Sequence, residues 1–263
     1  MNPSPALPHR NLLRIYALEA RYEFVKQLRL PAYVVPTLSF PIFFYILFGL
    51  VLGRSGSGMP NGAALYTLAT YGAFGVMAAT LFGFGIQVAL ERGQGWMLFK
   101  RATPMPPMAY FAAKTAMSLL FGMLIVGALF ALGFAAGGVR LPLGTWLSLG
   151  GTLILGALPF CAFGLAIGYF AGPNSAPAVV NLIYVPASFC SGLWIPIRFL
   201  PGWMQSAAHF LPPYYYGQLA LRTVGAGTGE PVGRSLLVLA VFTALSLAAA
   251  RIGFRRDEGR TYG

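Results

Sequence analysis

The sequence predicts an all-α protein that crosses a membrane six times, and two observations lead to this fold class. Apolar residues make up 57% of the 263 residues and charged residues only 9%, whereas soluble domains carry about 25% charged residues. The few charges flank long uncharged stretches, and each stretch can supply the roughly 20 apolar residues that a membrane helix needs. We therefore expect a single polytopic membrane domain over residues 1–263.

The uncharged stretches give the spans in order. Loop-forming residues separate some of them, as in SGSGMPNG at 55–62 and AGPNSAP at 171–177. Prolines inside spans, such as Pro159, predict kinks, and the G-x-x-x-G pair Gly164 and Gly168 allows two helices to approach closely. The expected spans are 32–53, 65–90, 110–137, 146–171, 177–195 and 235–253.

Residues 199–221 also lack charge, but they are not expected to form a seventh span. They contain three prolines, and a lipid-exposed helix cannot leave so many backbone groups unpaired. Six spans place 13 of the 18 Lys and Arg residues on one side and 5 on the other, whereas seven spans divide them equally. Positive charge concentrates in cytoplasmic loops. Both termini are therefore expected in the cytoplasm, and 196–222 is expected to be an extracellular re-entrant or interfacial hairpin.

Residues 10–30 are expected to form an amphipathic helix on the cytoplasmic membrane surface. Acidic residues interrupt its basic region, so it does not read as a cleaved signal peptide. Apolar residues recur at helical spacing along one face, and a helix of this kind lies in the membrane interface. The apolar stripe consists of Leu13, Ala17, Ala20, Phe24 and Leu28.

Charge and motifs argue against several functions. The net charge of +12 comes from the flanks of the spans and not from one basic face, so we expect no nucleic-acid partner. The sequence has no phosphate-binding loop, no metal-ligand spacing and no histidine inside a span. We expect neither catalysis nor a metal or cofactor site on this chain. No acidic residue lies mid-span, and Lys114, the one charge clearly inside a span, is expected to extend to the interface.

The loop ERGQGWMLFKRATPMPP at 91–107 is the most informative segment. A short apolar stretch follows its polar start, then come a basic pair and prolines. The loop either offers Trp96, Met97, Leu98 and Phe99 to a soluble surface or is a simple basic turn that fixes the orientation. The pattern alone leaves both open.

Two motifs resemble the membrane subunits of type-2 ATP-binding-cassette exporters. That family has Glu-Arg-Glu-x-Gly-Thr-Leu and then Ala-x-Pro after its second span; here Glu91, Arg92 and Gly95 match, as does the run 101–105, while Trp96 replaces Thr. The second motif is SGLWIP, LPGWMQ and LPPY followed by LR, within 191–222. It is similar to the family's Ser-Gly-x-x-x-Pro, Leu-Pro-x-Trp and Pro-Pro pattern. The resemblance covers the whole chain.

The resemblance implies a permease subunit of an exporter in the cell membrane. Two copies, most simply a homodimer, would form the pathway, and two ATPase subunits that bind ATP and Mg²⁺ would dock below them. The loop 91–107 would be the coupling helix, where Glu91 and Arg92 would pair or cap the helix. Its contact residues would be Glu91, Arg92, Gly95, Trp96, Met97, Leu98, Phe99, Arg101 and Pro104.

The same resemblance implies that the hairpin 196–222 is an extracellular gate, although a passive aromatic anchor is the alternative. The gate residues would be Pro196, Pro201, Trp203, His209, Pro212, Pro213 and Tyr214.

The sequence leaves the cargo open. Aromatic residues in the spans suit a hydrophobic drug, a lipid or a lipid-linked glycan, but they suit packing and lipid-facing positions at least as well. They are Phe43, Phe44, Tyr45, Phe82, Phe84, Tyr184, Phe189 and Trp194. Two other classes of function also stay open: an ion-coupled carrier that acts alone, and a membrane assembly factor that transports nothing.

Overall fold

The described part of the chain is all-helical, as the sequence predicted. The computed structural model describes residues 9–54, 63–96 and 107–258. Within these ranges, five helical stretches are long and apolar enough to cross a membrane. They are Pro31–Val51, Ala63–Gly93, Met108–Ala135, Leu143–Phe170 and Val232–Asp257.

The first half of the chain contains three of these stretches, and two of them contain a π-helical segment. A separate helix α1 (His9–Leu28) precedes them. The first stretch joins α2 (Pro31–Phe44), η1 (Tyr45–Val51) and α3 (Leu52–Arg54). The second joins α4 (Ala63–Thr80), η2 (Leu81–Ile86) and α5 (Gln87–Gly93). The third is the single helix α7 (Pro107–Ala135).

In the second half, the fourth stretch is broken at Gly156 and Ala157, directly before Pro159, where the sequence predicted a kink. It consists of α8 (Leu143–Leu155) and α9 (Leu158–Phe170). Shorter helices follow: α10 (Ala176–Cys190), η3 (Ile197–Phe199), α11 (Gly202–Ala208) and α12 (Pro212–Thr223). The long helix α13 (Val232–Glu258) ends the described chain.

Helix α10 is shorter than the span expected at 177–195. It has 15 residues, a length of about 22 Å, and it ends at Cys190, five residues before the expected end of the span. Gly192 has a positive φ of 75°, and the amide of Leu193 donates to the Ser188 carbonyl. This Schellman arrangement, which favours glycine, terminates the helix.

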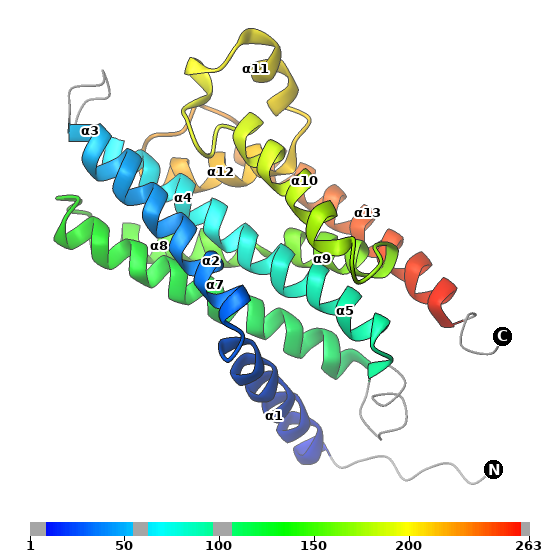
Figure 1. The fold of residues 1–263 in the computed structure, drawn as a ribbon. Helices are drawn as coiled ribbons and strands as arrows, with labels where there is room; N and C mark the ends of the chain where they lie inside the picture. Colours follow the sequence, from blue (N-terminus) through cyan, green and yellow to red (C-terminus); the bar gives the residue numbers. More distant parts are fainter. Residues whose placement is uncertain (1–8, 55–62, 97–106, 259–263) are drawn as a thin grey trace, which may run out of the picture.

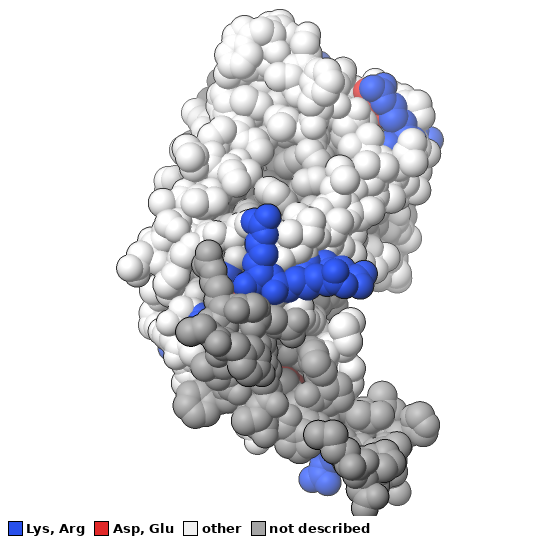
Figure 2. Space-filling view, turned by 90° about the vertical axis from the view of Figure 1, so that its right-hand side faces the viewer, with Lys and Arg blue, Asp and Glu red and all other residues white. Residues whose placement is uncertain are grey.

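The second stretch lies at the centre of the bundle and α13 at its outside. In the apolar 18-residue part of each stretch, 78% of the residues are buried in the second stretch but only 22% in the last one. Figure 1 shows the start of α1, the end of α5 and the end of α13 at one end of the molecule, with α3 and α11 at the other. On the face shown in Figure 2, most of the described surface is uncharged, and Lys and Arg side chains gather in one group near the middle of the view and in smaller groups at the upper right and the lower edge. A mainly uncharged surface suits a bundle that crosses a bilayer.

The hairpin region forms two short helices, and its tyrosines are buried instead of lying at a surface as interfacial aromatics would. Tyr214, Tyr215 and Tyr216 are all fully or almost fully buried. The Tyr216 hydroxyl donates to the Leu153 carbonyl in α8 at 2.6 Å. Trp203, on α11, is exposed. The chain from 212 to 223 is therefore part of the core, while α11 forms a cap above α10 (Figure 1).

Close packing of α9 on the second span depends on the glycine pair noted in the sequence. A Cβ at Gly168 would lie 2.8 Å from the Val88 Cβ, and a Cβ at Gly164 would lie 3.0 Å from the Phe84 Cβ. Both distances are too short for carbon atoms in contact. The pair therefore allows the two helices to approach closely.

We predict that Gly168→Ala destabilises the purified protein, because the new methyl group would overlap Val88. Overpacking of this kind costs about 1–3 kcal/mol, which thermal unfolding in detergent would show as a lower melting temperature. Gly151→Ala in α8 is the control, since a Cβ there meets nothing within 4 Å. Equal melting temperatures for the two variants would contradict the packing argument.

Candidate functional site

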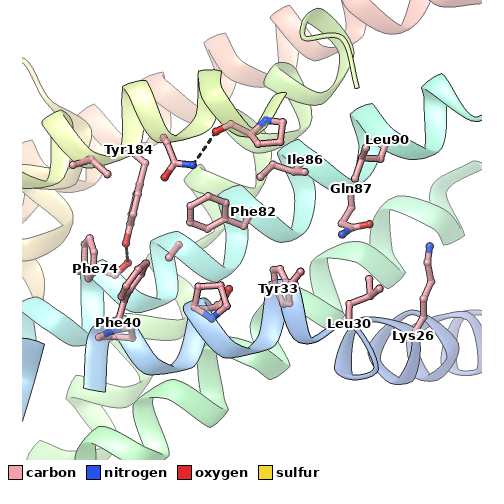
Figure 3. A pocket seen from close by; sticks show the side chains of 18 of the residues that line it. Lys26, Leu30, Tyr33, Phe40, Phe74, Phe82, Ile86, Gln87, Leu90 and Tyr184 are labelled. Carbon is pink, nitrogen blue, oxygen red and sulfur yellow. Dashed lines mark hydrogen bonds between the residues drawn. The ribbon is translucent and has the colours of Figure 1, made fainter. Parts of the chain in front are cut away.

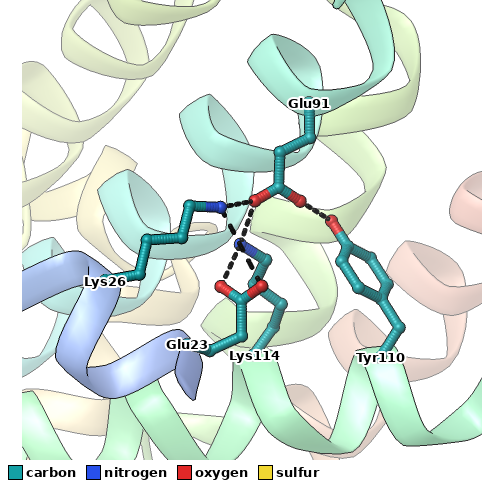
Figure 4. Close-up of polar contacts among 5 residues, drawn as sticks. All are labelled: Glu23, Lys26, Glu91, Tyr110 and Lys114. Carbon is teal, nitrogen blue, oxygen red and sulfur yellow. Dashed lines mark hydrogen bonds and ion pairs between the residues drawn. The ribbon is translucent and has the colours of Figure 1, made fainter. Parts of the chain in front are cut away.

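Buried charged side chains join α1, α5 and α7 at the end of the bundle that holds both described chain ends (Figure 4). The Lys114 ammonium donates to Glu23 Oε2 at 2.7 Å and to Glu91 Oε1 at 2.8 Å. Lys26 also donates to Glu91 Oε1, and the Tyr110 hydroxyl donates to Glu91 Oε2 at 2.6 Å. We call these five residues the charge cluster.

The charge cluster is electrically balanced, because two ammonium groups face two carboxylates. Lys114 is completely buried, and the carboxylates of Glu23 and Glu91 are almost as inaccessible. Burial of such groups is tolerated only when they are paired and hydrogen-bonded. The Lys26 side chain, by contrast, is 47% exposed. Partial burial alone would lower the pKa of Lys26, but the charge of Glu91 and its hydrogen bond raise that pKa above its usual value.

The charge cluster corrects three expectations. Lys114 does not extend to the interface but is bound inside the bundle. Glu91 pairs with two lysines and not with Arg92. The face that α1 turns to the bundle is mixed: Glu23 and Gln27 are buried, Phe24 from the expected apolar stripe packs on Phe121, and Leu28 from that stripe is exposed. The contact between Glu23 on α1 and Lys114 on α7 therefore adds to the apolar contact of Phe24 in holding α1 on the bundle.

Arg92 connects the end of α5 to two other helices. Its guanidinium donates to the carbonyl oxygens of Tyr169 and Ala171 at the end of α9, and it forms an ion pair with Asp257 in α13 at 3.8 Å. A cation at a helix C-terminus stabilises the unpaired carbonyls there. Arg92 therefore caps a neighbouring helix and not its own.

The described part of the expected coupling loop is short. Glu91 and Arg92 lie in α5, and Gly95 takes a positive φ of 75° just after the helix. Trp96 follows with 55% of its surface exposed. The remaining expected contact residues, Met97, Leu98, Phe99, Arg101 and Pro104, lie outside the described residues.

A groove of about 1060 Å³ runs from the charge cluster along the bundle (Figure 3). Side chains of α1, α2, the second span and α10 line it. Glu23, Lys26 and Glu91 are at one end, and Phe74, Tyr184 and Trp194 are at the other. Sequence reasoning missed this groove, because its walls come from segments far apart in the chain.

The aromatic span residues named in the sequence analysis occupy different places in the structure. Four of the eight line the groove: Phe44, Phe82, Tyr184 and Trp194. Tyr45 and Phe84 are instead buried in the core, and Phe43 is exposed on the surface of α2.

Two of the seven residues expected to form a gate, His209 and Tyr214, line a shallow recess at the opposite end of the bundle. Gln205, His209, Tyr214 and Glu230 line it among others. The Tyr214 hydroxyl donates to Glu230 Oε1 at 3.2 Å, and the rings of His209 and Tyr214 are 4.9 Å apart. Pro201 and Trp203 are exposed, whereas Pro196 and Pro213 are buried.

The five long apolar helical stretches in the described residues define a multi-pass membrane protein. Residues 16–224 match the model of the ABC-2 type transporter family, and the chain belongs to this family. Its sequence is also 29% identical, over 90% of this chain and 95% of the relative, to the Bacillus subtilis (strain 168) protein named "Putative transport permease YvfS".

Family membership makes the chain the membrane permease of an ABC-2 type transporter, a non-catalytic transmembrane subunit. The ABC-2 membrane domain itself carries no cofactor. The resemblance seen in the two sequence motifs is thereby confirmed. The sequence had left open an ion-coupled carrier that acts alone and an assembly factor. Both belong to other classes of protein than an ABC-2 permease.

We predict that Lys114→Met strongly destabilises the protein, because it leaves two buried carboxylates facing one partly exposed lysine. Removal of one partner from a buried ion pair costs about 3–5 kcal/mol. Thermal unfolding in detergent would measure the loss. Lys26→Met is the matched control: it removes the same group from the same cluster, but at a position that is about half exposed, where ion pairs contribute less. Equal losses for the two variants would contradict the cluster's assignment as buried.

Proposed function

We propose that this chain forms half of an export pathway, and that movements of a partner ATPase reach it through the charge cluster. ABC-2 permeases generally pair with ATPase subunits. The observation that carries the proposal is the position of Glu91: it is bound to α1 and α7, and it lies just before the segment 97–106. A force on that segment would act on three helices together.

The proposal places the charge cluster on the cytoplasmic side. Excess positive charge lies in segments at this end, including Arg251, Arg255 and Arg256 on α13, all exposed. Positive residues concentrate in cytoplasmic segments. In this orientation both termini are cytoplasmic, α10 completes six spans, and α11 with α12 forms the extracellular hairpin. The helix α1 would lie at the cytoplasmic surface while its polar face is fixed to α7.

Two copies of the chain and two ATPase subunits would form the complete exporter. The groove supports this arrangement because it is open along one side. Phe40 on α2 and Val185 on α10 are exposed along it. A second copy facing this side would enclose a shared apolar passage, and the exported molecule would be hydrophobic or lipid-linked.

We predict that replacement of residues 97–104 by a Gly/Ser linker abolishes co-purification with the partner ATPase, because it removes the apolar and basic side chains proposed to dock there. This exchange keeps Glu91 and Arg92, so the charge cluster stays intact. Trp96→Ala should weaken the association and lower ATPase activity in lipid.

The matched control is Trp203→Ala, which removes another exposed tryptophan at the opposite end. It should co-purify with the ATPase as the unchanged protein does. If the linker variant still binds the ATPase fully, the coupling assignment fails.

We also propose that α11 and α12 act as an extracellular gate. Support comes from their position: α12 is buried against the bundle, whereas α11 is partly exposed and forms a cap above α10 (Figure 1). His209, at the end of α11, contacts the Tyr214 ring and accepts a hydrogen bond from the Tyr215 hydroxyl, so a movement of α11 would change its contacts with the tyrosine core.

For the gate we predict that a cysteine at Ser206, which is exposed on α11, reacts with a maleimide at a different rate when ATP and vanadate trap the complex. A cysteine at Gly144, exposed at the start of α8, should react at an unchanged rate. Identical behaviour of both positions would leave α11 and α12 as a fixed aromatic anchor and overturn the gate.

A further inference from the structure

The groove differs chemically between its two ends (Figure 3). Lys26, Gln87 and Leu30 lie at one end in this view, Phe82 and Tyr33 lie near the middle, and Tyr184 with Phe74 lies at the other end. A molecule that fills the whole groove must therefore have one polar end and one apolar end.

The polar end of the groove offers hydrogen-bond donors beside a charge cluster that is balanced overall. The Lys26 ammonium is about half exposed, while the carboxylates paired with it are buried. The amides of Gln87 and Gln94 also line this end. Leu30 and Ala32 place the N-terminus of α2 there, and a helix N-terminus favours negative charge. Together these donors suit a head group with several acceptor oxygens, such as a phosphate.

The rest of the groove suits an alkyl chain. Phe44 contacts Trp194 with ring centroids 5.0 Å apart, and Phe74 stacks on Tyr184 at 4.9 Å; all four rings line the groove. From Glu91 to Phe74 the second span covers roughly 25 Å at 1.5 Å per residue. One leaflet of a bilayer supplies about 15 Å of hydrocarbon. The length therefore accommodates a lipid with its head group, and it exceeds what a compact drug needs.

We propose that the groove binds a membrane lipid with a phosphate-bearing head, which lies at Lys26, Gln87 and Gln94, while its chain extends along the aromatic wall to Trp194. That this lipid is the exported cargo rests on the proposed function, whereas the binding itself needs no ATPase. Lys26 is the residue that determines the preference for the head group.

The test is lipid binding by the purified chain in detergent, followed by native mass spectrometry. Phosphatidylglycerol and diacylglycerol with identical acyl chains are the probes, because they differ only in the phosphate-bearing head. The unchanged protein should bind phosphatidylglycerol at least tenfold more tightly. Lys26→Met should remove this preference, and Arg140→Met, an exposed arginine at the opposite end, should leave it intact.

A second variant tests the groove independently, in case the loss of Lys26 causes misfolding. Val185→Trp fills the groove from α10 without touching the charge cluster, and it should weaken the binding of both lipids. Equal binding of the two lipids by the unchanged protein, an unaltered preference in Lys26→Met, or full competition by inorganic phosphate would each overturn the proposal. Failure of the ATPase to co-purify, with lipid preference intact, would overturn the export function and leave the lipid site standing.

Discussion

The arrangement of one end of this permease depends on the burial of a single ammonium group. Lys114 has no access to solvent, so the cost of removing it from water must be offset by fixed negative partners. One partner, Glu23, comes from α1, and the other, Glu91, comes from the end of the second span. If α1 separated from the bundle, Lys114 would lose its contact with Glu23 and Glu91 would lose its contact with Lys26, while Lys114 and Glu91 stayed paired. A helix with only a weak apolar stripe is thereby held in a defined position.

The sequence predicted the elements of this fold well, because span-forming hydrophobicity is a local property. Five expected spans lie within a few residues of the observed apolar helices, and the break before Pro159 lies where the kink was expected. The early end of α10 had a local signal as well, since Gly192 can adopt the positive φ that ends a helix. The signal was ambiguous because many other glycines of this chain lie inside helices.

The charge cluster and the groove could not be predicted in the same way. Glu23 and Lys114 are 91 positions apart, and nothing local distinguishes a lysine that will be buried from one that reaches the interface. The family motif marked Glu91 as important but not its partners. The groove is likewise a product of tertiary structure, since Phe44, Phe82 and Tyr184 come from three separate helices.

Helix α5 connects the proposed ATPase contact to the proposed lipid site. Glu91 belongs to both the charge cluster and the lining of the groove, while its neighbour Arg92 binds the end of α9. A displacement of α5 would therefore change the Lys26–Glu91 contact and the carbonyl contacts of α9 together. An anionic head at Lys26 would compete with Glu91 for the same ammonium group. Occupancy of the groove and the position of α5 would thus be linked through one side chain, which gives cargo a direct physical means of affecting the coupling end.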